Sequence, residues 1–314
     1  WQIPIHGESI KPITAEPARK AIGQENIYER VNITHLLVDA NDPQRIAGAI
    51  GFGVREDKFY VFKAKAVLIT CGGASNVFRP RSINEGMGRT WYSVFATGSA
   101  YGLMIPIGTE MTQMEQRFVP TRFKDGYGPV GMWFQYFGAK ITNSKGEDYT
   151  VTREAELHKY KPYGLAVPTP TPLRNHQMFL DIKDGLGPMY MGTDKAMQKI
   201  AGNDPKKMRK VQEEAWEDFL DMTISQALTW ASQDIRPELT PSEVVLAEPY
   251  IMGSHSGESG AWVSGPEDLA PSDYFWGYNK MTTIKGLFAA GDGVGAAPHK
   301  FSSGSFTEGR LAAK

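Results

Sequence analysis

The stretch that decides the fold is AVLITCGG, residues 66–73. Its first half is an unbroken apolar run, and it ends in two consecutive glycines. A near-continuous apolar run of this length is typical of a strand in a parallel sheet that is buried on both faces. Glycine lets a backbone lie close to a ligand. The stretch therefore predicts an α/β domain with a ligand at the carboxyl end of this strand.

A second stretch, GLFAAGDG at residues 286–293, follows the same plan. A short apolar strand leads into Gly291 and Asp292, and a helix is expected to begin near Thr307. Ligands of doubly wound sheets bind outside the carboxyl ends of the strands, where a carboxylate can accept hydrogen bonds from sugar-type hydroxyls. With the three strand-like segments at residues 31–63, the two strand ends resemble the pattern of FAD-binding flavoproteins.

The sequence contains no glycine-rich dinucleotide fingerprint. Gly51 and Gly53 lack a third glycine at the required position, and the glycines within 291–295 have the wrong spacing. The chain also begins at Trp1 rather than Met, and it ends at Lys314 inside a helix-forming run. We therefore expect an internal fragment of a longer polypeptide, truncated before the first strand of the sheet.

The middle of the chain has a different character. Residues 119–180 are rich in aromatic residues, glycine and proline, which predicts long irregular connections. Residues 204–234 carry apolar side chains at helical spacing, and they predict a helix that Asp204 caps and Pro205 begins. A shorter helix is expected at residues 13–24. The predicted order is α/β material, an inserted mixed segment, and α/β material again.

Composition bounds the classes of function. The 314 residues suggest about two domains, 41% of them are hydrophobic, and the net charge of -1 offers no global field for nucleic acid. No apolar run approaches the length of a membrane span, and no signal peptide is evident, so we expect a cytoplasmic protein. The single cysteine, Cys71, excludes a disulfide framework, a zinc site of several thiolates and a four-cysteine iron–sulfur cluster within this chain.

Two polar residues lie in contexts that suit a binding site. Arg122 lies near aromatic residues, and a guanidinium beside aromatic rings favours flat or anionic ligands. His255 lies among glycines and serines, and its spacing to Glu258 suits a metal, but no third ligand is evident and no metal site is predicted. A surface ion pair for the arginine and an ordinary loop for the histidine remain open on composition alone.

Four longer stretches carry a family resemblance. They are RTWY at 89–92, RFKDGYGPVG at 122–131, PYIMGSHSGE at 249–258 and PHKFSSGSF at 298–306. Together they resemble the flavoprotein (alpha) subunits of dissimilatory adenylylsulfate reductases over essentially the whole chain. The wider relatives are the flavoproteins of fumarate reductase and succinate dehydrogenase.

The resemblance implies the fold and its division. The fold class is α/β, with a doubly wound FAD-binding domain like that of fumarate reductase flavoproteins and an inserted α+β capping domain. The first part of the FAD-binding domain would occupy residues 1–118, with its N-terminal fingerprint missing. The capping domain would occupy residues 119–250, and the returning part of the FAD-binding domain residues 251–314.

The resemblance also implies a reaction, the two-electron reduction of adenosine 5′-phosphosulfate (APS) to AMP and sulfite, or its reverse, through a flavin N5–sulfite adduct. It implies catalytic roles for Arg122, His255 and Trp91, the first two also binding the substrate. Gly131 and Gln135 would flank the nucleotide, although Gln135 stands where an apolar residue such as leucine is expected. FAD would be held by Thr70, Gly72, Gly73, Gly291, Asp292, Lys300, Phe301, Ser302, Ser303 and Ser305.

Electrons must come from another chain, because one cysteine cannot hold the clusters that the family uses. The resemblance therefore implies a ferredoxin-like iron–sulfur beta subunit with two 4Fe–4S clusters, an alpha–beta heterodimer, and a link to a membrane-bound electron-transfer complex. Cys71 stands where relatives usually have threonine, a small change that should leave FAD binding intact.

Two alternatives remain at this point. The first is a dicarboxylate flavoprotein of the fumarate reductase, succinate dehydrogenase or aspartate oxidase type. Against it, His255 is followed by Ser-Gly-Glu, and residues 299–303 lack the arginine that would hold a carboxylate. The second is a non-catalytic FAD electron-transfer subunit, and the presence of both Arg122 and His255 speaks against it.

Overall fold

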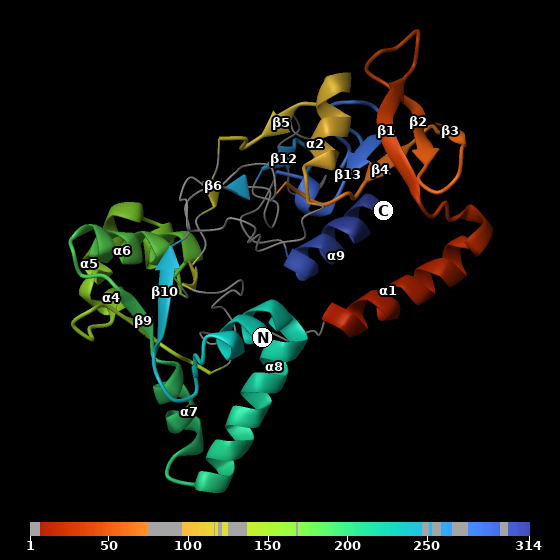
Figure 1. Ribbon diagram of the computed structural model, residues 1–314. Helices are drawn as coiled ribbons and strands as arrows, with labels where there is room; N and C mark the ends of the chain where they lie inside the picture. The colour runs from red at the N-terminus through yellow and green to blue at the C-terminus, as the bar shows by residue number, and fades with distance from the viewer. Residues whose placement is uncertain are drawn as a thin grey trace. The chain divides into compact units, whose positions relative to one another are not determined.

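The computed structural model describes residues 7–74, 96–115, 117–118, 121–124, 137–167, 169–246, 251–252, 259–265, 276–295 and 301–314 (Figure 1). The chain divides into two compact units. We call Ile22–Phe118 with Pro249–Lys314 the split unit, and Trp1–Ala21 with Val119–Glu248 the inserted unit. Residues 1–21 thus group with the inserted unit, whereas the predicted first part of the FAD-binding domain began at residue 1.

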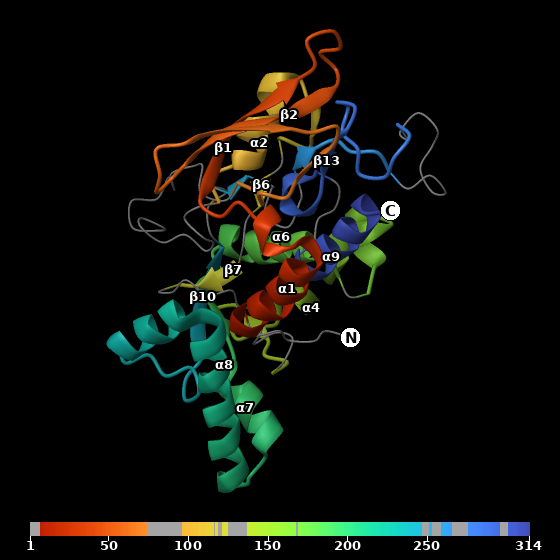
Figure 2. The same cartoon turned by 90° about the vertical axis from the view of Figure 1, so that its right-hand side faces the viewer.

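A three-stranded antiparallel meander opens the split unit. Strands β1 (Val31–Val38), β2 (Ile46–Gly53) and β3 (Phe59–Lys63) are ordered β1-β2-β3. These bounds agree with the three strand-like segments of the sequence. Helix α2 (Ser99–Met104) contacts β1, and Figure 2 shows it next to the meander.

The apolar strands within residues 66–73 and 286–293 pair with each other. Strand β4 (Val67–Ile69) lies parallel to β13 (Leu287–Ala289), and the amide of Ala290 donates to the carbonyl of Ile69 at 3.1 Å. Leu287 and Ala289 are fully buried. Leu68 is 47% exposed, so the prediction of burial on both faces is wrong at this residue. Successive side chains of a strand point to opposite faces, and only one face of this pair packs into the core.

Short elements complete the split unit. They are η1 (Gln24–Asn26), η2 (Ile105–Ile107), β5 (Met111–Thr112), β6 (Arg117–Phe118), β11 (Ile251–Met252), β12 (Gly260–Ala261), η7 (Gly291–Gly293) and α9 (Phe301–Ala312), whereas α1 (Gly7–Ile22) groups with the inserted unit except for its last residue. Strands β5 and β12 pair antiparallel, as do β6 and β11. The core joins the meander, α2 and the parallel pair through residues such as Ile46, Met104 and Leu287.

The inserted unit is built on a four-stranded antiparallel sheet. Its strands are β7 (Thr121–Phe123), β8 (Ile141–Thr142), β9 (Met189–Met191) and β10 (Ser242–Leu246), in the order β7-β10-β9-β8. Its helices are α4 (Tyr149–Thr152), α5 (Glu154–Leu157), η3 (His158–Tyr160), η4 (Tyr163–Leu165), α6 (Thr171–Lys183), α7 (Thr193–Ala201) and α8 (Pro205–Ser232).

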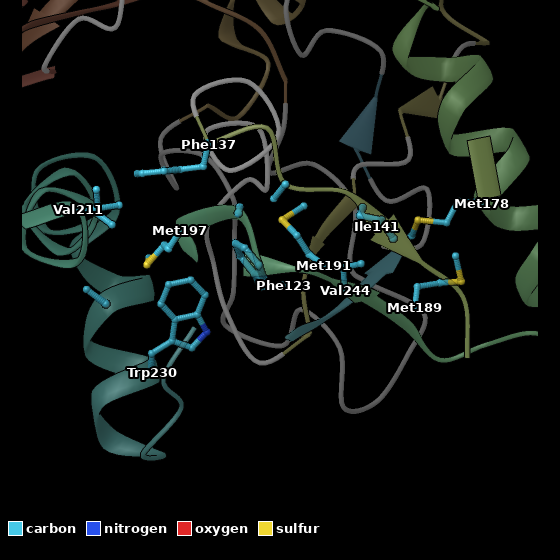
Figure 3. Packing of buried hydrophobic residues seen from close by; sticks show 14 of the residues in the cluster. Phe123, Phe137, Ile141, Met178, Met189, Met191, Met197, Val211, Trp230 and Val244 are labelled. Atoms are coloured by element: carbon cyan, nitrogen blue, oxygen red, sulfur yellow. The ribbon is translucent and has the colours of Figure 1, made fainter. Parts of the chain in front are cut away.

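Sheet and helices of the inserted unit enclose a core rich in methionine and aromatic residues (Figure 3). The rings of Phe123 on β7 and Trp230 on α8 meet edge to face, with centroids 4.8 Å apart. Four methionines at 178, 189, 191 and 197 are buried. Their flexible thioether side chains fill irregular gaps between a short-stranded sheet and several short helices.

The helices of the inserted unit test two predictions. The Asp204 carboxylate accepts from the amides of Lys206 and Lys207, so the predicted cap of α8 is confirmed. The prediction of irregular structure up to residue 180 is wrong for α6, which begins at Thr171. Pro172 lies in its first turn, where a missing amide proton costs no hydrogen bond. In the described part of the chain, no helix is both long and apolar enough to cross a membrane.

Candidate functional site

The loop after β4 is shaped by glycine. Gly72 has a φ of 76°, a left-handed conformation that other residues rarely adopt, and a side chain there would meet no atom within 4 Å. The carbonyl of Gly73 accepts from the amide of Gly98, the residue before α2. The loop that begins at Thr70 is therefore fixed to α2 on one side and open at Gly72 on another.

The loop after β13 lies against the first loop. Gly291 has a φ of 78° and begins the short turn η7. A methyl group on Gly293 would lie 3.1 Å from the Cβ of Ala100 and 3.3 Å from the carbonyl oxygen of Gly72. The structure thus brings together the two strand ends that the sequence places 220 residues apart, as parallel pairing requires.

The backbone of β12 packs directly against the backbone of residues 293–295, in the loop after β13. A side chain at Gly260 would collide with the carbonyl of Gly293, and one at Gly295 would lie 2.6 Å from the amide nitrogen of Gly260 and 2.8 Å from the carbonyl oxygen of Thr112. Glycine is needed at these positions because neighbouring backbones approach too closely for any Cβ atom.

Helix α9 begins beside these loops. It starts at Phe301, six residues before the predicted start near Thr307, because Ser302, Ser303 and Gly304 form its first turn. Serine is unfavourable inside helices yet favoured at their beginnings, where its hydroxyl can satisfy amides that lack a helical partner. The hydroxyl oxygen of Ser305 lies 3.6 Å from the Cβ position of Gly291.

One buried carboxylate joins α9 to the second loop. The Glu308 carboxylate accepts from the amide of Gly291 at 2.8 Å and pairs with the ammonium of Lys280 at 3.0 Å. The sequence-based prediction included neither Glu308 nor Lys280. Residue type and spacing gave no signal, because these partners are 28 positions apart and meet only in the fold.

This edge can hold an anionic ligand that carries a sugar or polyol. It combines two glycine loops after parallel strands, the carboxylate of Asp292 and the beginning of a twelve-residue helix, where amides and the helix dipole favour phosphate. The open space at Gly72 and the close approach of Gly291 to α9 fit the cofactor that the sequence predicts. Thr70, Gly72, Gly73, Gly291, Asp292, Ser302 and Ser305 lie at this edge, and so do the backbones of Phe301 and Ser303.

Cys71 lies within the first loop, and its surroundings disfavour the thiolate. Cys71 is exposed as a residue, but partial desolvation of its sulfur raises the pKa of the thiol above its usual value, and a backbone hydrogen bond at Thr70 acts the other way. We expect alkylation of Cys71 by iodoacetamide to be slower at pH 7 than alkylation of a free peptide cysteine, because less thiolate is present. Rates measured across pH by mass spectrometry should show a midpoint above the usual value of about 8.5. A midpoint below it would contradict this expectation.

In the inserted unit, Arg122 lies in the middle of β7. It is 4% exposed, it lies opposite Val245 of β10, and its guanidinium donates to the carbonyl of Lys124 at 3.3 Å. The ammonium of Lys124 in turn pairs with Glu243 at 2.8 Å. The structure therefore excludes a surface ion pair at Arg122 and shows a guanidinium held within the sheet region.

Five predicted site residues lie outside the described residues. They are Trp91, Gly131, Gln135, His255 and Lys300. The predicted pairing of Arg122 with His255 on the substrate remains a prediction. Among the described residues, no group of three or more histidine, cysteine, aspartate or glutamate side chains could hold a metal ion.

Among the described residues of the inserted unit, two cavities stand out, and neither is lined by a predicted site residue. One of about 380 Å³ is lined by residues including Phe123, Lys124, Trp230 and Glu243. The other, of about 530 Å³, is lined by residues including Lys140, Tyr190, Lys195 and Lys199. The first depends on how the sheet packs against α8 and the second on how it packs against α7, which the sequence pattern does not encode locally.

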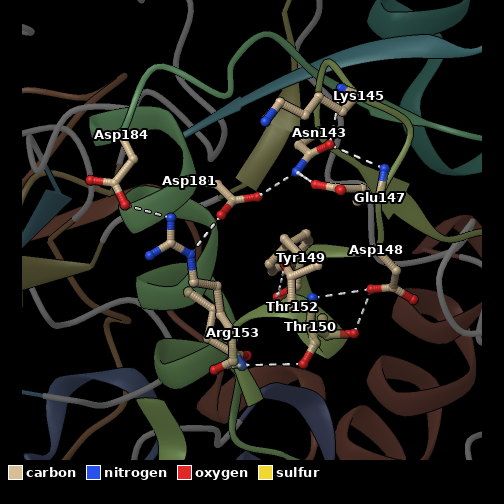
Figure 4. Close-up of polar contacts among 11 residues, drawn as sticks. Asn143, Lys145, Glu147, Asp148, Tyr149, Thr150, Thr152, Arg153, Asp181 and Asp184 are labelled. Carbon is tan, nitrogen blue, oxygen red and sulfur yellow. Dashed lines mark hydrogen bonds and ion pairs between the residues drawn. The ribbon is translucent and has the colours of Figure 1, made fainter. Parts of the chain in front are cut away.

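A polar network anchors α6 to the residues around β8 and α4 (Figure 4). The fully buried carboxylate of Asp181 pairs with the Nε of Arg153 at 2.7 Å and accepts a hydrogen bond from the side-chain amide of Asn143 at 3.0 Å. Arg153 also reaches Asp184. None of its members was predicted for the site, and its partners satisfy one another, so we assign it a structural role.

The sequence of the chain is similar to that of a known reductase subunit. No protein-family model matches the chain. The chain is 52% identical over 324 aligned residues to adenylylsulfate reductase subunit alpha of Megalodesulfovibrio gigas, which covers 100% of the chain and 49% of that protein. The chain thus spans about half the length of this curated relative.

Solved structures of the same kind of reductase superpose on the chain. Adenylylsulfate reductase from Archaeoglobus fulgidus superposes with a TM-score of 0.92 at 63% identity, covering 100% of this chain and 49% of that one. A structure of adenosine-5-phosphosulfate reductase in complex with sulfite, as a covalent adduct, gives the same values.

A more distant structure, a quinol-fumarate reductase, has a TM-score of 0.58 at 18% identity over 90% of the chain, and 44% of its own, and it shares the fold. The predicted fold class is confirmed. Along its whole length, the chain belongs to the same family as the matching half of the adenylylsulfate reductase alpha subunits.

Proposed function

We propose that the protein carrying this chain catalyses the two-electron reduction of adenosine 5′-phosphosulfate to AMP and sulfite, or the reverse reaction, with FAD as cofactor. The observation that carries this proposal is the 63% identity and TM-score of 0.92 to the reductase that was solved as a covalent complex with sulfite. The likeness to quinol-fumarate reductase, at 18% identity, extends to the fold only and gives no support for a dicarboxylate substrate.

The cofactor would lie at the strand-end loops of the split unit. Gly72, Gly73 and Gly291 let the backbone approach it, Asp292 would accept from its polyol hydroxyls, and the beginning of α9 would face its phosphates. Bound FAD would supply the two electrons that reduce sulfur. During reduction, the bond between sulfur and the phosphate oxygen breaks, and AMP leaves as an anion.

Cationic and hydrogen-bonding groups must stabilise the charge that develops as AMP leaves. Arg122 supplies a guanidinium whose place within β7 is fixed by backbone pairing and by the carbonyl of Lys124. A cation that is already ordered needs little reorganisation when charge develops, and this is the main source of such stabilisation in enzymes. The proposed partner of Arg122 on the substrate is His255, with Trp91, Gly131 and Gln135 near the nucleotide and the flavin.

We also propose a second subunit, because the curated relative is a subunit alpha. One cysteine cannot hold an iron–sulfur cluster of four thiolates, so a ferredoxin-like beta subunit would carry the clusters that exchange electrons with FAD. The resulting heterodimer would act in the cytoplasm and exchange electrons with a membrane-bound complex.

The proposal is tested on the full-length protein co-expressed with its proposed iron–sulfur beta subunit. We expect reduction of an artificial electron acceptor that requires AMP and sulfite together, and stoichiometric FAD after purification. Succinate, supplied at the same concentration, should give no acceptor reduction. Activity with succinate and none with AMP and sulfite would instead establish a dicarboxylate enzyme, and FAD without either activity would establish a non-catalytic flavoprotein.

A further inference from the structure

An unusual ion pair lies behind the proposed cofactor edge. The side chains of Lys280 and Glu308 are only 11% and 8% exposed, and the ammonium and carboxylate are 3.0 Å apart. Removing two charges from water costs more than their attraction usually returns, so such a pair is poor evidence for stability alone. A buried pair at this place calls for another explanation.

The second oxygen of the same carboxylate supplies one. Glu308 accepts from the amide of Gly291 at 2.8 Å, and Gly291 is the residue that turns the chain from β13 into η7. Ser305, one turn earlier on the same helix, lies beside Gly291 as well. The carboxylate thus connects α9 directly to the backbone of the loop that carries Asp292.

Lys280 is fixed to the same strand from the other side. Its amide donates to the carbonyl of Ser264 at 3.1 Å, and its carbonyl accepts from the amide of Ala289, the last residue of β13, at 3.1 Å. Its φ of 62° is a left-handed conformation, which a residue with a side chain keeps only where its surroundings over-determine it. The backbone of Lys280 is therefore held in place, and the Glu308 carboxylate lies between the Lys280 ammonium and the amide of Gly291.

We propose that Glu308 is a positioning residue for the cofactor, holding the Gly291–Asp292 turn at a set distance from the beginning of α9. This inference rests on the proposed function, since it assumes that the edge binds FAD. Phosphate and polyol groups are recognised by fixed backbone amides and one carboxylate, and their binding weakens when these groups shift by about 1 Å. Lys280 balances the charge of the Glu308 carboxylate, and the contact of Glu308 with Gly291 does the positioning.

The test separates positioning from stability with two variants of the co-expressed full-length protein. Lys280→Met keeps the acceptor for Gly291 but leaves a buried carboxylate without its cation. Lys280→Met combined with Glu308→Met removes both charges and the acceptor, in side chains of similar volume. FAD is first removed from each protein. One sample of the apoprotein is heated to measure its unfolding temperature. A second, unheated sample is reconstituted with FAD to measure FAD affinity and the visible circular dichroism of the bound flavin.

The unfolding temperature should fall mainly in the single variant, and FAD affinity should fall mainly in the double variant. We expect Lys280→Met to lower the unfolding temperature of the apoprotein while changing FAD affinity by less than about threefold. The double variant should unfold near the wild-type temperature, because apolar replacement of a buried pair is often neutral, yet bind FAD about tenfold or more weakly and with altered circular dichroism. A matched control, Lys210→Met with Glu214→Met in an exposed pair of α8, should change neither.

The opposite pattern would overturn the inference. If FAD affinity falls in Lys280→Met and recovers in the double variant, the pair acts only through stability. If the double variant does not fold, Glu308→Asp decides, because its shorter carboxylate cannot reach both partners and should weaken FAD binding, whereas unchanged affinity contradicts the proposal. A wild-type protein that binds no FAD at all would refute the proposed function itself, which is a distinct result.

Discussion

Replacing Arg122 with alanine is expected to lower the turnover of the assembled enzyme by about 10²–10³-fold while FAD stays bound. In the proposed mechanism, this guanidinium stabilises charge as AMP leaves, and removing one ordered donor to such charge has effects of this size in other enzymes. The contacts that hold the cofactor loops are made within the split unit, and Arg122 lies on β7 of the inserted unit. The measurement is acceptor reduction with AMP and sulfite, together with FAD stoichiometry.

Because Arg122 is buried, a loss of folding must be separated from a loss of chemistry. Arg122→Met keeps most of the volume and should reproduce the loss of turnover with little change in the unfolding temperature. Arg209→Ala, which removes an exposed arginine of α8 whose side chain is 83% exposed, serves as the control and should leave turnover unchanged. Turnover like that of the wild type in both Arg122 variants would remove Arg122 from the proposed site.

Replacing Asp181 with alanine is expected to lower the free energy of unfolding of the inserted unit by about 2–4 kcal/mol. Asp181 has no exposed surface, and both of its oxygens have partners, Arg153 at 2.7 Å and Asn143 at 3.0 Å. Its removal leaves the Nε of Arg153 without this buried acceptor, while Arg153 keeps Asp184 and the side-chain amide of Asn143 keeps Glu147. The loss should be smaller than for a fully buried pair, because the side chain of Arg153 is 25% exposed.

Asp184 provides the internal comparison for this prediction. It also pairs with Arg153, but its side chain is 53% exposed, so Asp184→Ala should cost less than about 1 kcal/mol. Urea unfolding followed by tryptophan fluorescence includes a signal from this unit, since Trp230 lies in its core and Trp216 packs against it, and the signal of Trp262 and Trp276 in the split unit is separated by replacing these two with phenylalanine in every variant. Equal losses for the two variants would show that the burial of Asp181 does not govern its contribution.

Patterns that are local in the sequence predicted local structure well. The alternation of apolar segments and turn residues placed β1, β2 and β3, and the Asp-Pro pair placed the beginning of α8, because each depends on a few neighbouring residues. The error at α6 arose because prolines were taken as marks of irregular structure, whereas Pro172 lies in a first turn. The error at Leu68 arose because the extent to which a sheet is covered depends on distant parts of the chain.

The candidate site divides in the same way. Glycines directly after apolar strands identified the loops at Gly72 and Gly291, since close backbone approach restricts the residue type there. The pairing of Lys280 with Glu308 depends on how α9 packs against a loop, and a lysine and a glutamate in sequence have no such signature. Roles for Arg122 and His255 came from family resemblance, not from their spacing.

The backbone contacts among Gly260, Gly293 and Gly295 bear on how this region can evolve. Where side chains meet, a substitution can be compensated by a change of rotamer or by a second substitution nearby. Where main chain meets main chain, no such compensation exists, so every descendant must keep glycine or lose the loop. Residues that face a ligand can then vary on a platform that stays the same.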